Sequence, residues 1–313
     1  MRGVMAVAGL CCAWSVLLGG QTQAPPVFRA DVDTVAVNVS VKRGNNPVSG
    51  LTPHDFRLYD NDVRQRVAAV SQDAVPVDIS FVIDLSPSVG DLETLREAVR
   101  RMTGLLRSTD RFRILTMGNS VVNAVPWQPA GPPDTSVVQS ALGHISLVVD
   151  SALLALLHRS DPDRRHLVVA FTDGQDICSV ATGDTLRRVA ERSDAVFHWI
   201  NIDPGRWNPL RGTGVESICR NYTHSPIDMS RFFTDATKLT GGSVRATTSS
   251  ATMTSVFDAI LDDFRRSYIL HFVPEGVSRE GWHRLRVELP ERQGYTVRTR
   301  PGYWGTAAVP AVR

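Results

Sequence analysis

Short apolar segments alternate with amphipathic segments between residues 77 and 266, and this alternation constrains the fold more than any other feature. Val77–Asp84, His166–Asp173 and Ala195–Ile202 are apolar on both faces, which is typical of strands buried in a parallel sheet. Segments of helical periodicity lie between them, namely Leu92–Leu106, Val148–His158, Thr185–Arg192, Arg231–Leu239 and Met253–Arg266. The pattern predicts an α/β fold with a doubly wound, mostly parallel sheet.

Three further strands complete the predicted sheet. Phe112–Gly118 and Ser120–Trp127 are close enough in the chain to form a hairpin, and Gly241–Ala246 is short enough for an edge strand. We therefore assign residues 75–266 to one α/β domain.

The two flanks of this domain have the pattern of β structure. Val32–Val41 alternates apolar and polar residues, and Phe56–Val70 has the pattern of a hairpin with Asn61 and Asp62 at its turn. Beyond Ser267 the chain again predicts strands. Each flank, 25–74 or 267–313, is too short to bury a core alone. We predict that they pack together as one small β-sandwich-like domain, at the pole away from the carboxyl ends of the central strands.

The N-terminus has the pattern of an export signal. One basic residue, Arg2, precedes an apolar stretch and a small-residue region that ends near Ala24. Residues 1–24 are therefore predicted to be a signal peptide, and the protein to be periplasmic, at the cell surface or secreted. The alternative is an uncleaved membrane anchor, which would be the chain's one membrane contact.

The charge composition bears on the kind of partner that the chain could bind. The formal net charge of +2, without a run of Lys or Arg, does not suggest nucleic-acid binding.

Of four cysteines, Cys11 and Cys12 lie in the export segment, which leaves Cys178 and Cys219. In an oxidising compartment two such thiols tend to form a disulfide. Two unpaired buried thiols remain the alternative.

Oxygen-bearing side chains follow the predicted strands at one edge of the sheet. Asp84, Ser86 and Ser88 come directly after the first central strand, "FTDGQD" follows another, and "HISLVVDSALL" begins a helix. Ligands of doubly wound sheets bind at this carboxyl edge. Hard oxygen ligands with few negative charges suit Mg²⁺, or the similar Mn²⁺. Ser88 could instead simply cap the following helix.

The same residues resemble those of a known family. "DLSPS" is similar to the DxSxS motif of von Willebrand factor type A (VWA) domains, and "FTDG" to their later strand-end Asp-Gly. The resemblance implies a metal-ion-dependent adhesion site, with Asp84, Ser86 and Ser88 in the first loop and Asp173 in the third. Ser146 takes the place of the threonine of the second loop. The flanks, with "GLTPHDFRLYDN" and "RPGYWG", resemble an exported bacterial VWFA-related subgroup.

Two function classes follow from these residues. In the first, the chain is a non-enzymatic adhesion module whose metal accepts a carboxylate from an unidentified protein partner. In the second, it is a metal-dependent hydrolase with Ser86 as nucleophile and Asp173 as its partner. No G-x-S-x-G elbow is present, which favours the binding module.

Residues outside this ligand set are interpreted structurally. Asp150 is expected at a helix start and Asp176 as a solvated or outer acid. His198 lies within a predicted strand and is expected to pack there. Trp127, Trp199 and Trp207 are assigned to the core or to loop anchors.

Overall fold

The computed structural model describes residues 34–72, 75–86, 89, 92–138, 145–176, 178–202, 226–248, 252–291 and 293–305. The predicted export segment lies outside these ranges. Within them, no helix is both long enough and apolar enough to cross a bilayer.

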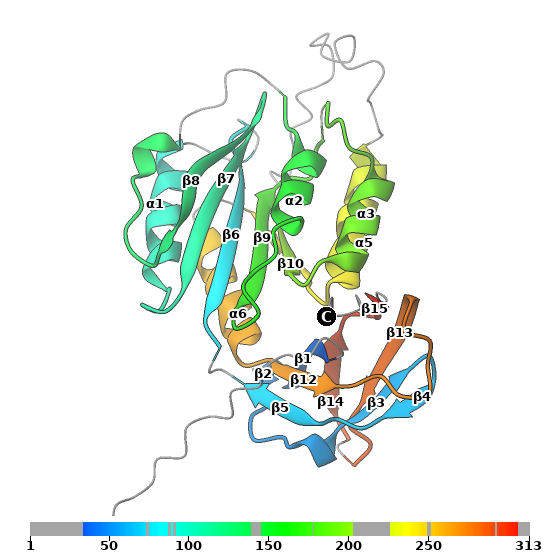
Figure 1. Cartoon of the computed structure of the whole chain (residues 1–313). Coiled ribbons are helices and arrows are strands. Elements are labelled where there is room, and N and C mark those ends of the chain that lie inside the picture. The colour runs from blue at the N-terminus through cyan, green and yellow to red at the C-terminus, as the bar shows by residue number, and fades with distance from the viewer. Residues whose placement is uncertain are drawn as a thin grey trace, which may run out of the picture. The chain divides into compact units, whose positions relative to one another are not determined.

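The centre of the fold is a six-stranded sheet with the order β11-β10-β9-β6-β7-β8 (Figure 1). Its strands are β6 (Val77–Asp84), β7 (Arg111–Met117), β8 (Val121–Pro129), β9 (Arg165–Thr172), β10 (Val196–Ile202) and β11 (Val244–Thr247). Only the β7–β8 pair is antiparallel. The doubly wound, mostly parallel sheet is therefore confirmed. The direction of strand order reverses between β6 and β9, and such a switch point is where ligands bind in open α/β sheets.

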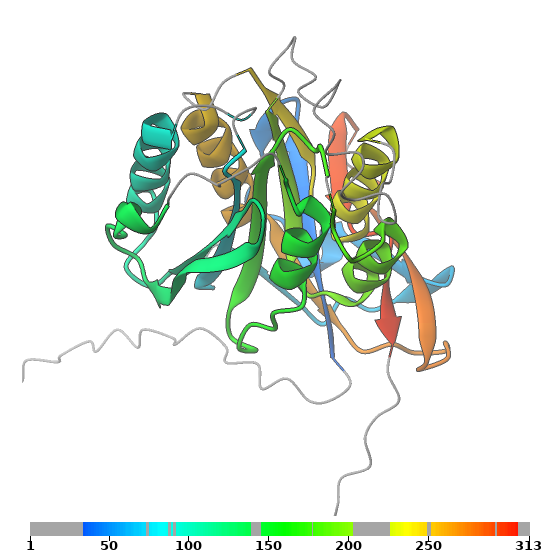
Figure 2. The same cartoon turned by 90° about the horizontal axis from the view of Figure 1, so that it is seen from above.

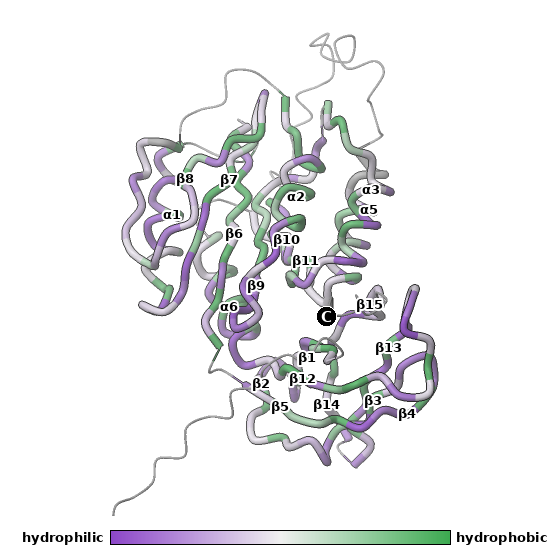
Figure 3. Tube along the Cα trace, viewed as in Figure 1, coloured by the Kyte–Doolittle hydropathy of each residue, from purple (hydrophilic) through white to green (hydrophobic). Residues whose placement is uncertain are grey.

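Helices cover both faces of this sheet (Figure 2). They are α1 (Leu92–Gly104), α2 (Val148–Leu156), α3 (Gly183–Arg192), α5 (Pro226–Leu239) and α6 (Met253–Arg265). α1 and α6 bury one apolar cluster and α2, α3 and α5 bury another, with Phe81 and Val82 of β6 facing opposite clusters. All eight residues of β6 are buried, and Figure 3 shows hydrophobic stretches along the central strands. The two-sided burial explains why these strands are continuously apolar.

The two flanks of the chain pair with each other in two smaller sheets. The first contains β1 (Val35–Arg43), β2 (Asn46–Pro47), β5 (Ala69–Gln72), β12 (Tyr268–Phe272) and β14 (Tyr295–Thr299). The second contains β3 (Arg57–Asp60), β4 (Val63–Gln65), β13 (Gly281–Glu288) and β15 (Gly302–Gly305). The described residues also form two short 3₁₀ helices, η1 (Pro53–Asp55) and η2 (Thr135–Val137).

Strand pairing confirms that the β region is built from both ends of the chain. β1 pairs with β12 and β14, and β3 pairs with β13. An apolar cluster that includes Val37, Leu58 and Phe272 fills the space between the sheets. Asn61 and Asp62 have positive φ values of 46° and 66°, so the predicted β3–β4 hairpin closes through a tight two-residue turn.

The β region lies beside the amino end of β6, away from its carboxyl end (Figure 1). α6 runs back from the carboxyl edge, and β12 follows its last turn directly. Arg165 joins the two regions, because its guanidinium donates to Asn38 Oδ1 at 2.7 Å and to Ser267 Oγ at 2.6 Å. Among the described residues, the β region thus lies at the end of the α/β domain away from the carboxyl end of β6.

Candidate metal centre

Asp84 is the last residue of β6 and is fully buried at the switch point of the sheet. Its Oδ1 accepts hydrogen bonds from Ser86 N at 2.8 Å and from Ser146 Oγ at 3.3 Å. Its Oδ2 accepts from Thr172 Oγ1 at 2.7 Å. Three segments that are distant in the chain thus meet on one carboxylate.

Two carboxylates, those of Asp84 and Asp173, interact at this point. Burial, followed by repulsion from Asp173, raises the pKa of Asp84 to about 6, although hydrogen bonds from Thr172 and Ser86 oppose the shift. Asp173 Oδ1 accepts from Gln175 N at 3.0 Å. A buried carboxylate beside a half-buried one favours a cation between or beside them.

The donor set fits a hard divalent cation. Asp84, Ser86 and Ser146 are at most 7% exposed, and they present carboxylate and hydroxyl oxygens. The described residues contain no group of three or more His, Cys, Asp or Glu side chains placed to hold a metal ion, so a metal here would depend on the serine hydroxyls. Ser88, the fifth predicted ligand, lies outside the described residues.

Thr172 was missed by the sequence interpretation. Besides donating to Asp84, its Oγ1 accepts from Gly174 N at 3.1 Å, and Trp199 Nε1 donates to its carbonyl at 3.1 Å. Gly174 has a φ of +79°, and a Cβ there would lie 2.7 Å from the Trp199 ring. Thr172 therefore orients Asp84, and Trp199 anchors the turn that carries Asp173. The signal was present in "FTDG", where the threonine directly precedes the predicted ligand.

Asp176 and Asp150 cross-link the second and third loops. Asp176 Oδ1 accepts from Val148 N at 2.9 Å, at the start of α2, and from Ser179 Oγ at 2.6 Å. Asp150, in the first turn of α2, accepts from the backbone N–H groups of Val180 and Ala181. Asp176 is half-buried and burial raises its pKa to about 6, so of the two expected roles its contacts fit the outer acid and not the solvated one. Asp150 lies at the helix start as predicted, and it also holds the neighbouring loop.

Cys178 lies in the loop after β9. It has a φ of 75° and takes part in a disulfide. The other three cysteines lie outside the described residues, so the pairing with Cys219 stays a prediction.

The other residues that the sequence singled out have packing roles. His198 is 1% exposed within β10, and its Nδ1 lies 3.1 Å from Ser243 Oγ. Trp199 packs on Phe233, with ring centroids 5.5 Å apart, and Trp127 packs on His158 at 4.7 Å. Trp207 lies outside the described residues.

Comparisons with known proteins give distant structural likenesses. No family model matches this sequence, and no curated protein matches it significantly. A von Willebrand factor type A protein from Catenulispora acidiphila is 12% identical, with a TM-score of 0.47, over 90% of this chain and 76% of that one. BatB from Bacteroides thetaiotaomicron is 13% identical, with a TM-score of 0.41, over 60% and 98%. Manganese-loaded TRAP from Plasmodium vivax is 13% identical, with a TM-score of 0.38, over 79% and 99%.

Solved VWA domains are thus among the structures similar to this chain. The narrower resemblance to an exported bacterial subgroup is not tested by them. Likenesses at this level of identity do not extend to metal, partner or activity.

Proposed function

We propose that this protein is an exported, metal-dependent protein-binding module. Mg²⁺ or Mn²⁺ would be held by Asp84, Ser86, Ser88, Ser146 and Asp173, and a partner would supply a carboxylate. The observation that carries the proposal is the convergence on Asp84, which is buried at the switch point and hydrogen-bonded to Ser86, Ser146 and Thr172.

Charge balance supports a carboxylate as the partner's group. Asp84 and Asp173 carry two negative charges when ionised, which one divalent cation neutralises. The serine hydroxyls add oxygen atoms without adding charge, so an incoming anion meets no excess of negative charge from the ligand set. When bound, the cation would supply electrostatic attraction for that anion.

Two observations support export. The first 24 residues have the composition of a signal peptide, and Cys178 takes part in a disulfide, which is typical of oxidising compartments. A periplasmic, cell-surface or secreted location follows from this proposal.

Metal binding is tested by isothermal titration calorimetry of the purified chain with Mg²⁺ and Mn²⁺. Asp84→Asn removes the central charge while it keeps the side-chain shape, and Asp184→Asn removes an exposed acid of α3 as a matched control. We expect parent and Asp184→Asn to bind the ions alike and Asp84→Asn to bind them much more weakly. Equal binding by all three would place the metal elsewhere.

Partner binding is tested by capture from the native cell envelope, with Mg²⁺ or with a chelator. A protein retained by the parent in Mg²⁺, and lost with chelator and with Asp84→Asn, supports the binding module. The hydrolase alternative is tested with generic esters and phosphates in Mg²⁺. Turnover that Ser86→Ala abolishes would favour that alternative.

A further inference from the structure

The first turn of α2 is capped by another segment of the chain. Leu147, its own N-cap residue, is apolar and makes no side-chain hydrogen bond to it. The first N–H groups of a helix have no partner within the helix. Here Val148 N donates to Asp176 Oδ1 at 2.9 Å, and Asp150 N donates to Ser179 Oγ at 3.2 Å. Asp176 and Ser179 therefore take the place of an N-cap.

Contacts in the opposite direction join the same two segments. The Asp150 carboxylate accepts from Val180 N at 2.9 Å and from Ala181 N at 2.8 Å. Two successive N–H groups converge on one carboxylate only in a particular turn conformation. Asp176 and residues 178–181, named here the capping loop, thus hold the start of α2 through both its N–H groups and its first acid.

The start of α2 in turn places a predicted metal ligand. Ser146 directly precedes Leu147, and its hydroxyl donates to Asp84 Oδ1 at 3.3 Å. Hydrogen bonds between a hydroxyl and an oxygen are usually about 2.5–3.0 Å long, so this one is near its limit. A small displacement of the start of α2 would take Ser146 away from Asp84.

Cys178 lies within the capping loop and has an unusual backbone conformation. Its φ of 75° falls in the left-handed region, which side chains other than glycine rarely adopt. It also takes part in a disulfide, and the nearest other cysteine in the sequence is 41 residues away. A covalent bond to a distant segment can hold a backbone conformation that a free loop would leave.

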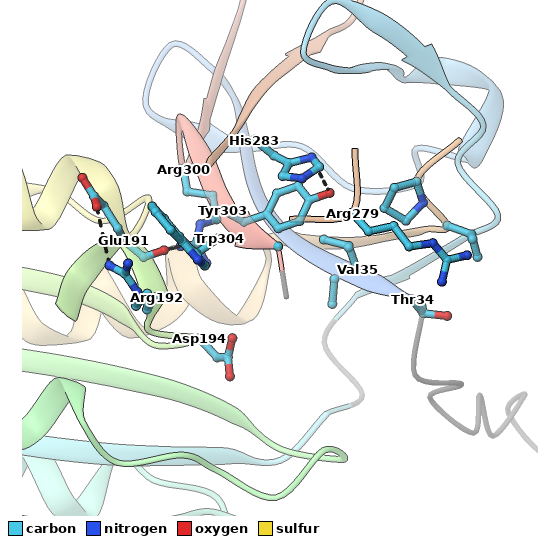
Figure 4. Close-up of a pocket in the computed structure, with 14 residues that line it drawn as sticks. Thr34, Val35, Glu191, Arg192, Asp194, Arg279, His283, Arg300, Tyr303 and Trp304 are labelled. Carbon is cyan, nitrogen blue, oxygen red and sulfur yellow. Dashed lines mark hydrogen bonds and ion pairs between the residues drawn. The ribbon is translucent and has the colours of Figure 1, made fainter. Parts of the chain in front are cut away.

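The elements on either side of the capping loop are anchored independently of the disulfide. At the end of β9, Trp199 Nε1 donates to Thr172 O at 3.1 Å. At the far end of α3, Arg300 donates to Glu191 O at 2.8 Å, beside a pocket of about 330 Å³ (Figure 4). A change at Cys178 therefore acts on the capping loop rather than on β9 or α3.

We propose that the Cys178 disulfide holds the capping loop on α2 and thereby sets the affinity of the metal centre. This inference rests on the proposed metal function and adds its regulation, since the reduced chain binds the ion more weakly than the oxidised chain. Forming the bond removes two protons and two electrons from two thiols, and a disulfide oxidant is reduced to two thiols in exchange. Oxidants of this class belong to export compartments, so the metal centre is completed after export.

Metal affinity is measured by titration calorimetry of the full chain with Mn²⁺, before and after reduction. Dithiothreitol opens the disulfide, becomes its own cyclic disulfide, and is removed in oxygen-free buffer. We expect the affinity to fall at least about tenfold, the lower end of what outer residues contribute to a metal site. Cys178→Ser should bind as weakly as the reduced parent and should not respond to dithiothreitol. Equal affinity of the oxidised and reduced parent would overturn the proposal.

Hydrogen exchange tests the capping loop without any metal. In chelator, reduction should speed exchange of the backbone N–H groups in residues 146–152 and leave those of α6 unchanged, because the start of α2 loses its acceptors. Unchanged exchange at the start of α2 would contradict the proposal. If the oxidised parent binds no Mn²⁺, the proposed metal function fails and the claim on affinity with it, while exchange still decides whether the disulfide holds the capping loop.

A pair of variants tests the path from the disulfide to the metal. Asp176→Ala removes an acceptor for α2, and Asp134→Ala removes the acceptor for Ser136 N at the start of η2 as a matched control. We expect Asp176→Ala to weaken Mn²⁺ binding about tenfold and Asp134→Ala to bind like the parent. Reduction should weaken binding less in Asp176→Ala than in the parent, because the two changes disrupt the same contact.

The coupling between the two changes separates this path from a general loss of stability. The same loss of affinity on reduction in Asp176→Ala as in the parent would show that the disulfide does not act through the capping loop. Thermal melting gives the temperature below which each chain is folded, and the titrations are made there. If Asp176→Ala does not fold, Ser179→Ala tests the same link, since its hydroxyl accepts from Asp150 N.

Discussion

Two buried carboxylates, Asp84 and Asp263, show how differently one chain can treat the same group. Asp84 lies at the carboxyl edge of the sheet, where burial and Asp173 raise its pKa to about 6. Asp263 lies on α6 where it meets the β region, and it contacts Arg298 at 2.5 Å and Lys42 at 3.1 Å. Burial opposes ionisation there too, but these cations and Ser40 lower the pKa of Asp263 below its usual value.

The comparison separates a structural ion cluster from an incomplete one. Asp263 finds its countercharges within the chain, so it can hold the two regions together unaided. Asp84 is surrounded by neutral hydroxyls and by a second acid, so an external cation would complete its surroundings. Substitution of each carboxylate should reveal this difference.

Replacing Asp263 with Asn should lower the free energy of unfolding by about 2–3 kcal/mol, because it leaves the half-buried Arg298 without its anion. Asp262→Asn, at the adjacent and half-exposed position, should lower it by less than about 1 kcal/mol. Urea unfolding of both variants measures the difference. Similar losses in the two variants would mean that the contact between α6 and the β region does not depend on this ion cluster.

Replacing Asp84 with Asn should act on metal affinity rather than on stability. A ligand carboxylate is lost, and we expect a decrease of at least about 100-fold, the upper end of what outer-shell partners contribute. In chelator, the variant should unfold at nearly the same urea concentration as the parent, because the repulsion from Asp173 disappears together with the charge. A large loss of stability in chelator would show that Asp84 is structural, like Asp263.

Moderate acid should destabilise the contact between the α/β domain and the β region through His198, before it protonates Asp263. Burial, and then Arg298, lowers the pKa of His198 from 6.5 to about 3. The unfolded chain therefore binds an extra proton between these values. The contribution of His198 is complete above pH 6.5 and is lost as the pH falls through this window, by about 1.4 kcal/mol per pH unit.

The contribution of Asp263 has the same sign but a lower window, since its folded pKa is below the ordinary 3.8. It is complete above that value and is lost only as the pH falls beneath it. Between pH 6.5 and 5, His198→Asn should therefore remove about 2 kcal/mol of the parent's loss of stability. Chemical unfolding at both pH values checks this. An unchanged pH dependence in the variant would exclude His198 as the cause.

The sequence predicts the sheet well because burial on both faces leaves a direct trace. Val77–Asp84 and His166–Asp173 are continuously apolar until the residue that faces the edge, so Asp84 and Asp173 could be placed there. The resemblance to VWA domains added Ser146, whose hydroxyl lies 3.3 Å from Asp84. Local periodicity and the positions of the strand ends were sufficient to predict the central sheet and the residues at its carboxyl edge.

The cross-links between distant segments could not be predicted in the same way. Whether Asp60 meets His283 depends on the register of β3 against β13, in which Asp60 opposes Leu285. Asp176 looks exposed in "DGQD" because nothing local indicates that it accepts from the start of α2. Side chains whose partners are set by tertiary packing leave no periodic pattern in the sequence.

The smallest effect should come from Thr172→Val, which keeps the volume of the side chain and removes the donor to Asp84 Oδ2. Because Thr172 orients a predicted ligand without being one, we expect metal affinity to fall by about tenfold, the lower end for such outer residues. Thr103→Val is the matched control, since that buried hydroxyl bonds to Val99 O within α1. Calorimetry with Mn²⁺ should give the parent's affinity for Thr103→Val. If Thr172→Val also binds Mn²⁺ like the parent, the carboxylate of Asp84 does not need this bond to face a cation, and the hydrogen-bonded cluster around it is a matter of folding alone.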